Sequence, residues 1–195
     1  MHRIPNILSS VRIILSPIFL FLWFQDEFLL KLVGLVVYII AAVTDYFDGY
    51  YARKYEVETT LGIFLDPLAD KFLTFSGFFV LPFIDEEQFP WWAIGLIIFR
   101  DVVITIFRVY TNRKKQPMIT RFTAKAKTTI QMIFLYLGLV VGLFKNVDFF
   151  LGDWVRMLLG TDILLYLMIF VASVTLYSGI EYIVINKSVF KKSSS

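Results

Sequence analysis

Four aspartates between residues 45 and 70 stand at spacings that bring carboxylates together on helices. Asp45 and Asp48 are three residues apart, and Asp66 and Asp70 are four apart, so each pair lies on one face of a helix. An ionised side chain at the centre of a membrane helix costs about 2.5–3.5 kcal/mol on insertion scales. Oxygen ligands suit hard divalent cations, and such ions would neutralise four clustered carboxylates. We therefore predict a metal site held by these four aspartates.

The residue types present exclude most other kinds of metal site. The chain has no cysteine and a single histidine, His2, whereas zinc sites use Cys or His ligands. An all-carboxylate site selects Mg²⁺ or Mn²⁺ instead. Antiparallel helices joined by a short loop would bring the two aspartate pairs together. Such a cluster can hold two ions about 3.5–4 Å apart, the arrangement used for in-line displacement at phosphorus.

Small residues and one arginine lie beside the aspartates. Gly49, Ala52 and Gly62 are positions where a larger side chain would block a ligand or a neighbouring helix. The planar guanidinium of Arg53 can offer a fork of donors to a diphosphate. The whole stretch therefore predicts metal-assisted chemistry on a diphosphate.

The rest of the chain is composed for a lipid environment. Of its 195 residues, 58% are hydrophobic and 18% aromatic, which is typical of polytopic membrane proteins. Apolar runs predict six membrane spans, each of about 20 residues, at residues 6–24, 29–51, 61–84, 91–110, 126–144 and 162–185. The segment 146–160 is too short to span and is predicted to be a short amphipathic piece at the interface. We expect one domain over residues 1–195, ending in a basic polar tail at 186–195.

Charge sorts the connections between these spans onto two sides. Of the 19 lysines and arginines, twelve fall on the side of the N-terminus and three on the opposite side, and the others lie within or at the ends of spans. Basic loops stay in the cytoplasm, so both termini are predicted to be cytoplasmic. The fold class expected is thus an all-α membrane protein with six transmembrane helices and its acidic motif near the cytoplasmic boundary.

The acidic motif resembles the signature of a known family. Its spacing, Asp45-x2-Asp48-Gly49-x2-Ala52-Arg53-x8-Gly62-x3-Asp66-x3-Asp70, is that of the CDP-alcohol phosphatidyltransferase family. Within that family the chain is most similar to the branch that uses glycerol-3-phosphate as acceptor, through Pro5-Asn6-Ile7-Leu8-Ser9 followed by Arg12, Phe64-Leu65-Asp66-Pro67-Leu68-Ala69-Asp70-Lys71, Arg100-Asp101 and Ala124-Lys125-Ala126-Lys127-Thr128-x2-Gln131. Two positions depart from the pattern: Ala124 replaces a glycine, and Asp101 replaces a glutamate.

The resemblance implies a membrane enzyme with the CDP-alcohol phosphotransferase fold, usually a homodimer, that moves a phosphatidyl group from CDP-diacylglycerol to an alcohol and releases CMP. It implies Mg²⁺ or Mn²⁺, two ions per site, on Asp45, Asp48, Asp66 and Asp70. Asp70 would also be the base that takes the proton of the acceptor hydroxyl. The residues facing the CDP-linked lipid would be Asn6, Gly49, Ala52, Arg53 and Gly62. The expected location is the bacterial cytoplasmic membrane, with the active site at the cytoplasmic face and no nucleic-acid partner.

Basic residues at the end of the fourth span, before the fifth span and at its start form the predicted acceptor site. Arg121 and Lys125 are four residues apart, Lys127 and Gln131 repeat that spacing, and Arg108 ends the fourth span. We predict that the phosphate of glycerol-3-phosphate binds Arg108, Arg121, Lys125 and Lys127. The alternative for such cations is contact with acidic lipid headgroups, which we favour for Arg113, Lys114 and Lys115. Arg100 lies deeper and is a candidate to pair with an aspartate of its own bundle.

Other functions stay open at this point. The same fold could use phosphatidylglycerol, inositol phosphate or serine as acceptor. A cation transporter with the aspartates as ion path is a weaker alternative, because the acids cluster at one side and no internal repeat appears. Ser173, Thr175 and Ser178 are predicted to form hydrogen bonds between helices rather than to act as nucleophiles, since no histidine is available to activate them.

Overall fold

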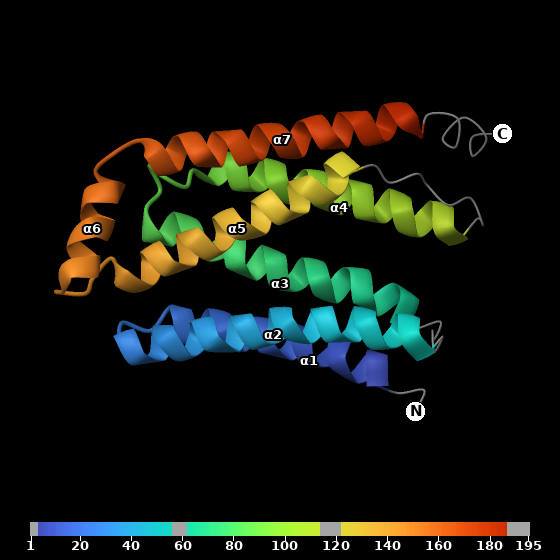
Figure 1. The fold of residues 1–195 in the computed structure, drawn as a ribbon, viewed down its shortest axis with the longest axis horizontal. Helices are drawn as coiled ribbons and strands as arrows, with labels where there is room; N and C mark the ends of the chain where they lie inside the picture. The colour runs from blue at the N-terminus through green and yellow to red at the C-terminus, as the bar shows by residue number, and fades with distance from the viewer. Residues whose placement is uncertain (1–3, 56–61, 114–121, 187–195) are drawn as a thin grey trace. The chain divides into compact units, whose positions relative to one another are not determined.

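The computed structural model describes residues 4–55, 62–113 and 122–186, and side chains at 11–44, 71–109, 111 and 123–186. Within these ranges the chain forms seven helices and no strand (Figure 1). The helices are α1 (Ile4–Trp23), α2 (Phe28–Tyr55), α3 (Gly62–Ile84), α4 (Trp91–Arg113), α5 (Phe122–Phe144), α6 (Phe150–Leu159) and α7 (Ile163–Ile185). The predicted all-α class is confirmed for the described residues.

The six long helices coincide with the six predicted spans, and the short α6 falls in the segment predicted not to span. Among the described residues, two stretches are long and apolar enough to cross a membrane, Thr123–Phe144 and Ile163–Ile185. The apolar parts of the first three helices, Val11–Trp23, Phe28–Thr44 and Lys71–Ile84, are shorter. The number of crossings and the side on which the termini lie stay predictions.

The helices divide into two compact units. The first contains Met1–Leu81 and Leu139–Gly152, and the second contains Pro82–Gly138 and Asp153–Ser195. In the first unit α1 and α2 run side by side (Figure 1). Phe19 is fully buried there, with ring centroids 5.6 Å from Trp23 and 4.8 Å from Tyr38. A Cβ on Gly34 would lie 3.1 Å from the Cβ of Leu22, so the glycine allows the two helices to approach closely.

In the second unit α4 packs against α7. The buried residues of α7 recur every three or four positions, as expected of one helix face against a neighbour: Leu164, Met168, Val171, Ala172, Thr175, Ser178, Gly179 and Tyr182. The other face is also apolar but exposed, with Phe170, Tyr177, Ile180 and Val184 all more than half exposed. A helix that is apolar on every side and exposed on one is typical of a membrane span.

A buried glutamine, Gln88, links separate segments of the second unit. Gln88 is 5% exposed; its Nε2 donates to the carbonyl of Leu159 at 3.2 Å, and its Oε1 accepts from the backbone N–H of Leu165 at 3.1 Å. The same residue's backbone N–H donates to Asp85. One side chain therefore holds the segment before α4 to the turn between α6 and α7.

The short helix α6 has the predicted amphipathic character. Phe150, Trp154 and Met157 are exposed apolar side chains, while Asp153 and Arg156 form an exposed ion pair at 2.6 Å. The first turn of α6 requires glycine at position 152, because a Cβ on Gly152 would lie 1.8 Å from the carbonyl oxygen of Val147.

Candidate active site

The acidic motif lies on two helices of the first unit. Asp45, Asp48, Gly49, Ala52 and Arg53 belong to α2, and Gly62, Asp66 and Asp70 belong to α3. The backbone at these positions is helical, so residues three and four apart share a helix face as predicted. Asn6 lies on α1 of the same unit. The side chains of all nine residues lie outside the described part of the structure, and their assignment to metal and CDP-lipid stays a prediction.

Among the side chains that are described, no group of three or more His, Asp or Glu residues could hold a metal ion. The four predicted ligands are not among those side chains. The described part of the chain therefore offers no alternative metal site of this kind.

The four predicted acceptor residues have different surroundings. Arg121 lies outside the described residues. Lys125 is exposed near the start of α5, and Arg108 is exposed on α4, with its guanidinium carbon 5.8 Å from the ring centre of Tyr182 on α7. That distance is within the range of a cation–π contact. Lys127 is different, because only 2% of it is exposed.

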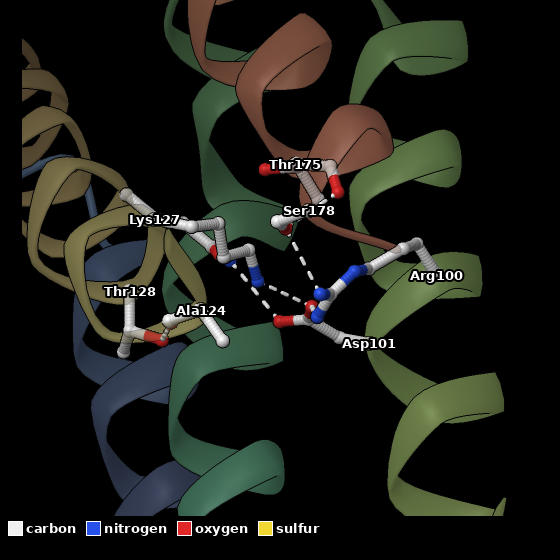
Figure 2. Close-up of polar contacts among 8 residues, drawn as sticks. Arg100, Asp101, Ala124, Lys127, Thr128, Thr175 and Ser178 are labelled. Atoms are coloured by element: carbon white, nitrogen blue, oxygen red, sulfur yellow. Dashed lines mark hydrogen bonds and ion pairs between the residues drawn. The ribbon is translucent and has the colours of Figure 1, made fainter. Parts of the chain in front are cut away.

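Lys127 reaches an aspartate of α4 (Figure 2). Its Nζ donates to Oδ1 of Asp101, which is also 2% exposed. The Nη1 of Arg100 lies 3.1 Å from the same oxygen, and Nε2 of Gln131 lies 3.4 Å from Oδ2. Asp101 thus receives donors from α4 and α5. The expectation that Arg100 pairs with an aspartate of its own bundle is confirmed.

Arg100 also reaches α7 (Figure 2). Its Nη2 donates to Oγ of Ser178 at 2.9 Å, and Ser178 donates in turn to the carbonyl of Thr175 at 2.9 Å. The predicted hydrogen bond between helices is therefore confirmed for Ser178. It is wrong for Ser173, whose hydroxyl donates to Ile169 one turn earlier in the same helix, as serines in apolar helices often do. Within the described residues, the buried Oγ1 of Thr175 has no hydrogen-bond partner.

One polar contact in this unit was not anticipated from the sequence. The hydroxyl of Thr123 at the start of α5 donates to Oε2 of Glu181 on α7. Glu181 is the one carboxylate in the whole of α7, and an acidic residue in an otherwise apolar helix is the signal that could have identified it.

The sequence of this chain matches that of a known protein family. The sequence model of CDP-alcohol phosphatidyltransferases matches residues 2–174. The chain belongs to the CDP-alcohol phosphatidyltransferase family. The membership predicted from the aspartate motif is thereby confirmed, and the chain is an enzyme of this class.

Several bacterial relatives carry one common name, CDP-diacylglycerol–glycerol-3-phosphate 3-phosphatidyltransferase. The protein of that name from Bacillus subtilis strain 168 is 34% identical over 145 residues, covering 68% of this chain and 74% of the relative. Those from Salmonella typhimurium strain LT2 and Escherichia coli strain K12 are 32% and 31% identical over 138 residues, with the same coverage. CDP-alcohol phosphatidyltransferases generally use a divalent metal ion.

Proposed function

We propose that this CDP-alcohol phosphatidyltransferase moves the phosphatidyl group of CDP-diacylglycerol to glycerol-3-phosphate, giving phosphatidylglycerophosphate and CMP. The observation that carries the proposal is the set of relatives, each above 30% identity and matching 68% of the chain, whose shared name states both substrates. The complete aspartate motif on α2 and α3 supports the same chemistry.

In this proposal Asp45, Asp48, Asp66 and Asp70 hold Mg²⁺ or Mn²⁺, two ions per site. The donor set fits such ions, because it is made of carboxylates alone in a chain without cysteine. Bound metal would neutralise the diphosphate and stabilise CMP as the leaving group. Asn6, Gly49, Ala52, Arg53 and Gly62 contribute the surface for the CDP-linked lipid.

The reaction exchanges one phosphorus–oxygen bond for another. The acceptor hydroxyl attacks the phosphorus that carries the diacylglycerol, the bond to the CMP oxygen breaks, and Asp70 takes the hydroxyl proton. The displacement needs no oxidant or reductant. It needs the acceptor hydroxyl to lie in line with the leaving oxygen, which is the purpose of a separate site for the acceptor phosphate.

The acceptor phosphate is proposed to bind basic residues of α4, α5 and the segment before α5, namely Arg108, Arg121, Lys125 and Lys127. A phosphate ester carrying one or two charges needs about two or three charge-assisted donors in exchange for water. The exposed ammonium of Lys125 is a donor of this kind. A neutral or bulky acceptor would not require several cations.

The enzyme is proposed to be a multi-pass homodimer in the bacterial cytoplasmic membrane, with six crossings, both termini in the cytoplasm and the active site at the cytoplasmic face. The charge distribution along the sequence supports this topology. Reporter tags at both ends should give a cytoplasmic signal, and a tag after Glu87 should report the opposite side. Tags at the two ends that report different sides would contradict six crossings.

The acceptor can be tested directly. Purified protein with CDP-diacylglycerol and Mg²⁺ is supplied in turn with glycerol-3-phosphate, phosphatidylglycerol, inositol phosphate and serine, and CMP release is measured. Of the four acceptors, only glycerol-3-phosphate is expected to give CMP release. Release with another acceptor and not with glycerol-3-phosphate would keep the family and overturn the acceptor.

A further inference from the structure

The second unit contains a buried group of charged and polar residues that binds three helices together. We name it the Asp101 cluster; it comprises Arg100, Asp101, Lys127 and Ser178 (Figure 2), together with Gln131. We propose that Asp101 and Lys127 are positioning residues for the acceptor site: their ion pair fixes the rotation of α5, so that Lys125 points away from the helix contacts and toward the acceptor phosphate. This inference rests on the proposed function and changes the role of Lys127 within it.

The rotation argument follows from helix geometry. Successive residues of an α-helix are about 100° apart around its axis, so Lys125 and Lys127 lie about 200° apart, on opposite faces. The structure has this pattern, since Lys125 is exposed and Lys127 is buried against Asp101. An interaction that holds Lys127 inward therefore holds Lys125 outward.

Charge explains why the ion pair is strong enough to set this rotation. The Asp101 cluster contains two cations, Arg100 and Lys127, and the carboxylate of Asp101 contacts both. Side-chain exposure is 11% for Arg100 and 2% for the other two. A buried charge separated from its counter-ion is strongly unfavourable, so turning α5 away is opposed because it would separate the buried ammonium of Lys127 from the carboxylate of Asp101.

Helix α7 completes the arrangement by leaving room for Arg100. A Cβ on Gly179 would lie 3.0 Å from both Cγ and Nε of Arg100, closer than such contacts normally are. The guanidinium passes over this glycine to reach Ser178. Gly95, on α4, provides a matched control because a Cβ there would meet nothing within 4 Å.

The sign of one kinetic effect separates positioning from direct phosphate binding. If Lys127 binds the phosphate directly, Asp101→Asn removes a competing carboxylate and should lower the KM for glycerol-3-phosphate. If Lys127 positions α5, Asp101→Asn and Lys127→Met should each raise that KM about tenfold, equivalent to about 1.4 kcal/mol. The double variant should then be no worse than the poorer single variant, because both changes break one interaction.

Variants with smaller structural changes keep the test open if Asp101→Asn does not fold. Gly179→Ala and Ser178→Ala should raise the KM for glycerol-3-phosphate roughly threefold, while Gly95→Ala and Ser173→Ala should not change it. Ser173 is a fair control since its hydroxyl, like that of Ser178, donates to its own helix but accepts nothing from Arg100 among the described contacts. The KM for CDP-diacylglycerol should stay constant throughout.

A chemical probe measures the rotation of α5 without any substrate. The chain has no cysteine, so Lys125→Cys introduces a unique thiol at the exposed position. Its labelling rate by a water-soluble maleimide should fall at least about threefold when Asp101→Asn or Gly179→Ala is added, and should not fall with Gly95→Ala.

Unchanged labelling, a lowered KM in Asp101→Asn, or additive effects in the double variant would overturn the inference. A wild-type protein that does not release CMP with glycerol-3-phosphate would instead overturn the proposed function, and the labelling result would still decide the positioning role.

Discussion

The acidic motif of α2 and α3 and the Asp101 cluster of α4, α5 and α7 both place charge in apolar helices, but they differ in where the compensating charge comes from. The acidic motif is four carboxylates within 26 residues of chain, and in the proposed function its counter-ions are metals from solution. The Asp101 cluster takes its compensation from side chains: Lys127 is 26 residues from Asp101, and Ser178 is 78 residues from Arg100. The acidic motif can therefore be recognised from the spacing of residues along the chain, whereas the Asp101 cluster forms only when the helices pack together.

The largest effect is expected in the acidic motif. Asp66→Asn keeps the side-chain volume but removes a charged metal ligand, so turnover should fall about a thousandfold or more, near 4 kcal/mol of transition-state stabilisation. CMP release in detergent with saturating substrates measures this, and excess chelator should have the same effect on the wild type. Asp153→Asn is the control, because Asp153 is exposed and pairs only with Arg156 among the described contacts. A fully active Asp66→Asn enzyme would contradict the metal site.

The Asp101 cluster should show its largest effect in stability. Asp101→Asn leaves Arg100 and Lys127 buried without their shared carboxylate, and breaking a buried pair from one side costs about 3–5 kcal/mol. Lys127→Met removes one of the two cations and leaves Arg100 paired with Asp101, so it should be less harmful. Thermal unfolding of the purified variants measures the order. Equal destabilisation by the two substitutions would mean that the carboxylate is not shared.

The exposed lysine of α5 should affect substrate binding rather than stability. Removing one charge-assisted donor costs about 1.5–3 kcal/mol, so Lys125→Ala should raise the KM for glycerol-3-phosphate roughly ten- to a hundredfold, and Arg121→Ala should do the same. The melting temperature and the KM for CDP-diacylglycerol should hardly change. Thr129→Ala, another exposed position on α5, is the control. A parallel loss for both substrates would assign these cations to the lipid surface instead.

The smallest effect is expected at Gln88. Gln88→Leu removes two hydrogen bonds, to Leu159 and Leu165, each contributing about 0.5–1.5 kcal/mol. The melting temperature should therefore fall modestly while both KM values stay the same. Gln25→Leu is the matched control, since Gln25 follows α1 and its Nε2 donates only to the carbonyl of Phe21, four residues earlier, among the described contacts. A changed KM in Gln88→Leu would show that the acceptor site depends on this end of the unit.

Much of the fold was accessible from the sequence because membrane helices have a strong one-dimensional signal. A run of apolar residues long enough to cross a bilayer leaves helix as the main way to satisfy the backbone. Each of the six predicted spans corresponds to one long helix, and the segment 146–160 contains the short amphipathic α6. The family was accessible for a related reason: metal chemistry at a diphosphate demands particular residue types at particular helical spacings, as between Asp45 and Asp70.

The surroundings of individual side chains were decided by tertiary structure. Lys125 and Lys127 are the same residue type and lie two positions apart in the sequence, and both were predicted to bind phosphate. The position of α4 places Asp101 against one of them and leaves the other exposed. Ser173 and Ser178 were likewise indistinguishable until packing put Arg100 beside Ser178. Sequence determines which residues share a helix face, because that depends on local geometry; which face meets a neighbour depends on contacts between residues far apart in the chain.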